Sequence, residues 1–100
     1  MAARENLLRW TGEAGDPVGA RELAAALVAD DERMLGSEHR HTLLARAHLV
    51  RWTGEAGDVI RTQELAGELI EDCKRILGPN HRYTLLARAH LARWIGETGQ

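Results

Sequence analysis

Several features that mark particular classes of protein are scarce or missing in this chain of 100 residues. A single cysteine, Cys73, cannot form an internal disulfide, which excludes a disulfide-stapled secreted domain. The longest purely apolar run, residues 23–29, is far shorter than the roughly 20 residues of a membrane span. No signal-peptide segment stands at the N-terminus, so we expect a cytoplasmic protein. The net charge of −2 makes nucleic acid and acidic membranes unexpected partners.

Residues that favour strands or irregular structure are also rare. Phenylalanine is absent, proline occurs only twice, and alanine and leucine are the most frequent residues. Strong helix formers therefore dominate the chain, which predicts an all-α protein.

The chain repeats itself with a period of 42 residues. Residues 3–44 and 45–86 align without a gap and are identical at 24 of 42 positions. Residues 87–100 match the start of the second unit at 10 of 14 positions. Such a repeat predicts equivalent units that bury their apolar faces against one another. We therefore expect residues 1–100 to form one domain of two full units and the first third of another.

Each unit is predicted to form two helices. In the second unit, Ala45, Leu49, Trp52 and Ala56 recur at the spacing of one helix face, and another apolar stripe spans residues 65–77. A Gly-Asp dipeptide ends the first stripe, and a Gly-Pro-Asn cluster ends the second. Short connections make neighbouring helices antiparallel. The sequence thus predicts five helices and no strand, near residues 3–14, 17–35, 40–56, 59–77 and 82–98.

A motif of the form Leu-Gly-x-x-His-x-x-Thr-Leu stands at each junction between units. Its residues are Leu35, Gly36, His39, Thr42 and Leu43, then Leu77, Gly78, His81, Thr84 and Leu85. Together with the paired helices and the Gly-Asp turn inside each pair, this motif resembles the tetratricopeptide repeat, in the long 42-residue variant of kinesin light chains. Similar repeats occur in bacterial regulatory ATPases of the signal-transducing nucleotide-binding class. The resemblance covers the whole chain and implies a right-handed α-solenoid of two helix pairs plus a closing helix.

Two residue types invite a ligand-binding interpretation, but a structural role is favoured for both. Trp10, Trp52 and Trp94 lie on the apolar stripes, so we expect them in the core rather than stacked on a ligand. The five histidines lack the cysteine or carboxylate partners of a structural zinc site, so no metal site is predicted. His39 and His81 lie in the junctions, where we expect local hydrogen bonds or helix capping.

No set of residues predicts catalysis, and no cofactor is expected. Cys73 lies in the middle of a predicted helix among apolar residues and is expected in the core. The acidic side chains at residues 30–32, and likewise those at residues 71–72, are consecutive on a helix and so point in different directions, which is typical of a solvated face. Residues 12–15 lack the Gly-Lys-Ser/Thr end of a phosphate-binding loop. An enzyme is therefore the least favoured class.

Charged residues recur on the first helix of each unit. Arg9, Arg51 and Arg93 lie 42 residues apart, and a glutamate follows each of them one turn later. Because first helices line the concave groove of tetratricopeptide solenoids, the resemblance implies that these positions face a groove. The expected partner-binding residues are Glu5, Asn6, Arg9, Glu13, His48, Arg51, Glu55, His90, Arg93 and Glu97, with Ala47 and Ala89 as small lining residues. Either the guanidinium groups bind a carboxylate or acidic peptide, or Arg and Glu neutralise one another across repeats.

The leading prediction is a non-catalytic protein–protein interaction module, a fragment of a larger bacterial regulatory protein, that binds a partner protein or peptide in this groove. The alternative is a self-assembling scaffold, either a homodimer through the C-terminal helix or a domain swap. The last unit keeps Leu91 and Trp94 and has Ile95 where the earlier units have threonine. One apolar side of this segment would then lack a partner within the chain. We therefore expect Leu91, Trp94 and Ile95 to mediate self-association.

Overall fold

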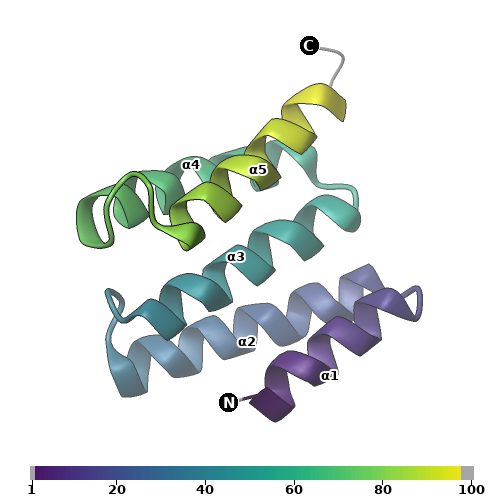
Figure 1. Cartoon of the computed structure of the whole chain (residues 1–100). Coiled ribbons are helices and arrows are strands. Elements are labelled where there is room, and N and C mark those ends of the chain that lie inside the picture. Colours follow the sequence, from purple (N-terminus) through teal and green to yellow (C-terminus); the bar gives the residue numbers. More distant parts are fainter. Residues whose placement is uncertain (1, 98–100) are drawn as a thin grey trace.

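The computed structural model describes residues 2–97, with side chains from residue 3 to residue 94. The helices in this part of the chain are α1 (Ala2–Glu13), α2 (Pro17–Leu35), α3 (Arg40–Glu55), α4 (Val59–Ile76) and α5 (Arg82–Glu97). No strand occurs between residues 2 and 97 (Figure 1). The predicted all-α class and the five predicted helices are confirmed, and each boundary lies within one residue of the expected position.

Local signals explain where the helices start and stop. The Asp16 carboxylate accepts a hydrogen bond from the Gly19 N–H at 2.9 Å, and Pro17 follows as the first helical residue. Asp58 caps α4 in the same way. The turns that follow the helices contain glycines with a φ near +100°, a conformation that other residues rarely adopt. These glycines are Gly15, Gly36, Gly57 and Gly78.

The junction motif forms the same structure at both of its occurrences. His39 Nδ1 accepts a hydrogen bond at 3.1 Å from the backbone N–H two residues later, and Thr42 Oγ1 donates to the Gly36 carbonyl at 2.8 Å. His81 and Thr84 make the equivalent bonds at the same distances. The predicted capping role of the junction histidines is therefore confirmed, and both threonines are fully buried.

Consecutive helices pack antiparallel, and α3 also packs on α5 (Figure 1). One core lies between α3, α4 and α5 and includes Leu43, Leu69 and Cys73. The other lies between α1, α2 and α3 and includes Leu8 and Trp52. Because α3 contributes to both cores, it joins the two units. The predicted core position of Cys73 is confirmed, and burial is the main cause that raises the pKa of its thiol.

The three equivalent tryptophans have different surroundings. Trp52 and Trp94 are 3% and 7% exposed and lie against Gly12 and Gly54 respectively, whereas Trp10 is 60% exposed. A side-chain carbon on either glycine would overlap the indole ring. The predicted core position is confirmed for two of these residues. It is wrong for Trp10, because the described part of the chain has no helix before α1 to supply the glycine.

Candidate functional site

The predicted partner-binding residues lie on the odd-numbered helices. Glu5 from α1, His48 and Arg51 from α3, and His90 and Arg93 from α5 lie close enough to influence one another electrostatically. Glu5 acts on His48, Arg51 acts on both histidines, and Arg93 acts on His90. We call these five electrostatically interacting residues of three helices the His–Arg row.

The other predicted groove residues have mixed positions. Arg9 and Glu13 are exposed on α1, and Asn6 is half-buried there. Ala47 was expected to line the groove, and this is wrong. The residue is 1% exposed and lies in the core with residues of α4. Glu97 lies in α5, but its side chain is outside the described ones.

The Arg and Glu residues pair across repeats at one position but not at the equivalent one. Arg93 Nη1 lies 2.9 Å from Glu55 Oε2. Arg51 has no ion pair to a carboxylate among the side chains of residues 3–94, so it does not pair with Glu13. Its guanidinium instead lies 4.3 Å from the centroid of the Trp52 ring, a cation–π contact that holds it in place. Arg51 therefore contacts an aromatic ring and keeps its charge free of a carboxylate within residues 3–94, so it can bind an anion.

Burial favours the neutral form of the two histidines beside Arg51. Desolvation is the main cause that lowers the pKa of both His48 and His90, and the charge of Arg51 lowers each further. The charge of Glu5 opposes this shift at His48. A neutral imidazole has one donor and one acceptor nitrogen. The row thus presents a guanidinium flanked by hydrogen-bonding rings, which suits a carboxylate.

Two cavities that the sequence did not predict lie on the other face of α3, between α2 and α4. Their volumes are about 360 and 330 Å³, and both are lined by Leu49 and Leu65. Glu32 and Glu68 also line the larger one. No motif marks these cavities, because their lining residues come from three helices of two units and follow no single periodic pattern.

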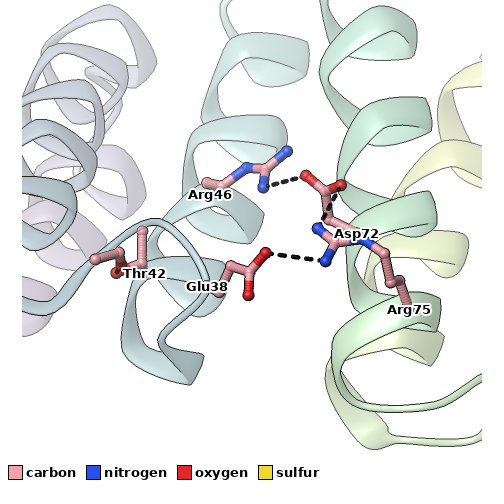
Figure 2. A network of polar contacts seen from close by, with 6 residues as sticks. Glu38, Thr42, Arg46, Asp72 and Arg75 are labelled. Atoms are coloured by element: carbon pink, nitrogen blue, oxygen red, sulfur yellow. Dashed lines mark hydrogen bonds and ion pairs between the residues drawn. The ribbon is translucent and has the colours of Figure 1, made fainter.

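An ion-pair network lies at the edge of the larger cavity (Figure 2). Arg46 Nη1 lies 2.8 Å from Asp72 Oδ2, and Arg75 contacts both Asp72, at 3.5 Å, and Glu38, at 2.9 Å. Hydrogen bonding to Arg46 is the main cause that lowers the pKa of Asp72. Because these charges are paired with one another and join α3, α4 and the junction loop, we assign the network a structural role.

Acidic residues on α2 show one further difference from expectation. Asp31 was predicted on a solvated face, yet it is only 5% exposed. It stands at the repeat position of Cys73, and this position faces the interior in both units.

The residues predicted to mediate self-association are placed differently from expectation. The expectation that Trp94 is exposed is wrong, because its ring lies against α3 and is buried. Leu91 is half-buried against the core between α3, α4 and α5. The side chain of Ile95 is outside the described ones. Among the described side chains of α5, the large apolar ones that are exposed are instead Leu85 and Leu86, at 47% and 37%.

Among the described residues, no group of three or more histidine, cysteine, aspartate or glutamate side chains could hold a metal ion. No helix within residues 2–97 combines the length and the apolar character needed to cross a membrane. A scan against protein-family models, a search of curated proteins and a search of solved structures each find no match to this chain. The repeat and the geometry of its helices are therefore the basis for assigning a function.

Proposed function

We propose that the chain is a non-catalytic protein–protein interaction module of the tetratricopeptide kind, which holds an acidic segment of a partner against the His–Arg row. The proposed arrangement of its units is a right-handed α-solenoid. The 42-residue repeat, the antiparallel helix pairs and the contact between α3 and α5 support this arrangement. The electrostatic interactions among Glu5, His48, Arg51, His90 and Arg93 of three helices support the binding face.

Arg51 is the observation that carries this proposal. A carboxylate can accept two parallel hydrogen bonds from a guanidinium group, and Arg51 has no carboxylate partner among the described side chains. Its contact with Trp52 already restricts the side chain, so binding costs less conformational entropy than at a freely rotating arginine. Arg93 would contribute less, because Glu55 already neutralises it.

Titration of a fluorescently labelled peptide of consecutive glutamates tests the proposal. The variants to compare are Arg51→Gln and Arg40→Gln, which each remove one positive charge from α3. Arg40 is exposed at the opposite end of that helix and serves as the matched control. We expect Arg51→Gln to weaken binding by about tenfold or more, since it removes a charge-assisted bidentate contact.

Arg40→Gln should bind nearly as the parent does, and both variants should keep the parent's circular dichroism spectrum. Raising the ionic strength should weaken peptide binding to the parent more than to Arg51→Gln. The parent makes one more charge pair with the peptide than the variant does, and salt screens that pair. Equal affinities of the two variants would show that the peptide does not use the His–Arg row.

A further inference from the structure

A cleft between α2 and α4 lies on a different face of α3 from the His–Arg row. Its walls, α2 and α4, both pack on α3 but hardly on each other (Figure 1). Leu49 and Thr53, four residues apart, share the face of α3 that forms its floor, whereas His48 and Arg51 share another face. The two cavities described above are both lined by Leu49 and Leu65, so they adjoin each other. We call the combined depression the α2–α4 cleft.

The two walls of this cleft run in the same direction. Arg21 and Asp58, which line the smaller cavity, lie near the first turns of α2 and α4. Glu32 and Asp72, which line the larger cavity, lie near the last turns of the same helices. The C-terminal end of a helix carries a partial negative charge and favours cations. Two helices therefore contribute to a negative potential at the larger cavity.

Charged side chains increase this potential. The larger cavity is lined by three carboxylates, those of Glu32, Glu68 and Asp72, against the single guanidinium of Arg46. Figure 2 shows Arg46 turned toward Asp72, with their ion pair at 2.8 Å. Neither Glu32 nor Glu68 has an ion pair among the side chains of residues 3–94. The two glutamates thus leave two negative charges uncompensated, one on each wall of the cleft.

The two glutamates are not a consequence of the repeat. Glu32 corresponds to Lys74 in the second unit, and Glu68 corresponds to Ala26 in the first. Each unit therefore contributes one glutamate from a different repeat position. The two residues line one cavity only because α2 and α4 lie on either side of α3.

We propose that the α2–α4 cleft is a second protein-binding surface, which takes a basic segment of a partner protein. An arginine or lysine of that segment enters the larger cavity between Glu32 and Glu68. A leucine-like side chain one helical turn away rests on Leu49 and Leu65. This surface is separate from the His–Arg row and selects a partner segment of the opposite charge.

Charge and spacing together define this occupant. An acidic segment would be repelled here, and a purely apolar one would desolvate the glutamates without compensation. Among the described residues, no group of acidic or histidine side chains is arranged to hold a metal ion, which leaves a cationic side chain as the complement. Leu65 and Glu68 lie one turn apart on α4, about 4.5 Å along the helix axis. A helical partner segment has the same spacing between side chains three residues apart.

Fluorescence anisotropy with labelled peptides tests the proposal. The probe is a helical peptide of alanine and glutamine in which one arginine follows one leucine by three residues, and a second probe has alanine in place of that leucine. Glu32→Gln, Glu68→Gln and the double variant remove charge from the cleft. Glu13→Gln is the control, because it removes one charge from α1, which lines neither cavity. All three glutamates are exposed, so the variants should keep the parent's circular dichroism spectrum.

We expect the parent to bind the leucine-containing probe with a dissociation constant of about 0.1–1 mM, since the contact is small. Each single cleft variant should weaken binding about threefold, and the double variant about tenfold, as for partly exposed ion pairs. Glu13→Gln should bind as the parent does. Arg51→Gln should also bind as the parent does, so this proposal and the proposed function can fail separately.

Three results would overturn the proposal. The first is a parent that shows no saturable binding of the probe up to several times the expected dissociation constant. The second is a set of cleft variants that bind as tightly as Glu13→Gln. The third is equal affinity of the parent for the two probes, which would show a general attraction of arginine to an acidic protein rather than binding in the cleft.

Discussion

Replacing Gly54 by alanine tests whether the stacking of units depends on the absence of a side chain. Gly54 is buried on α3, and a Cβ atom built there would lie 2.5 Å from Cζ2 of Trp94 and closer still to two neighbouring ring atoms. Such an approach is too short for non-bonded atoms, so either the ring or the whole of α5 must move. Because α5 packs mainly on α3 and α4, the substitution should loosen the end of the stack.

Two effects of opposite sign determine how much Gly54→Ala changes the free energy of unfolding. Alanine favours a helix over glycine by about 1 kcal/mol. Overpacking of a core costs about 1–3 kcal/mol, and complete expulsion of an indole that buries ~150 Å² would cost roughly 4 kcal/mol. We therefore expect Gly54→Ala to lower the free energy of unfolding by about 2 kcal/mol.

Gly67 is the matched control for this substitution. It also lies inside a helix, α4, but a Cβ atom built on it meets nothing within 4 Å. Gly67→Ala should therefore raise the free energy of unfolding by up to about 1 kcal/mol. Urea unfolding followed by circular dichroism measures both changes, and a red shift of the tryptophan fluorescence would report the movement of Trp94. If both alanine variants are more stable than the parent, the tight packing of the ring on Gly54 is refuted.

Three further substitutions have expected outcomes. Thr84→Val should lower the free energy of unfolding by about 1 kcal/mol in thermal denaturation, because the Gly78 carbonyl loses its hydrogen bond from the hydroxyl of the buried Thr84. Arg46 lowers the pKa of Asp72 in the folded state. The ion pair therefore stabilises the fold at pH values above the pKa of the unfolded state, near 3.8, and this stabilisation is lost as the pH falls through the pKa of the folded state. Arg46→Gln should therefore show a shallower loss of stability on acidification in urea titrations below about pH 5. The pKa values of His48 and His90 are lowered on folding, mainly by burial, so stability should decrease as the pH falls below about 6.5, and His90→Gln should reduce that decrease in urea unfolding.

Elements that depend on local chemistry could be predicted from the sequence. The ends of α2 follow from Asp16, Pro17 and Gly36, since a capping carboxylate, a proline at the first position and a glycine at the end act over a few residues. The hydrogen bonds of His39 and Thr42 lie inside one junction and therefore recur wherever the motif recurs. Helical periodicity then places the core side of each helix, as the buried Leu69 shows.

Features that depend on neighbouring helices could not be predicted in this way. Arg51 and Arg93 have nearly the same local sequence, yet among the described side chains only Arg93 is paired with a glutamate of the preceding unit. Ala47 was expected to line the groove with Arg51, but it is buried in the core with residues of α4, the helix that pairs with α3 inside the same unit. The cavities between α2 and α4 likewise arise from the spacing of helices and have no counterpart in a single-helix pattern.

Equivalent residues show most directly that the neighbouring unit determines burial. Leu43 and Leu85 both follow the junction threonine, yet Leu43 is fully buried against α4 and Leu85 is 47% exposed. Within the described residues, no helix covers that side of α5. Trp52 and Trp10 differ in the same way at the other end. Since α3 has a neighbouring unit on both sides, its apolar residues Leu43 and Trp52 are covered, whereas their equivalents Leu85 on α5 and Trp10 on α1 are exposed.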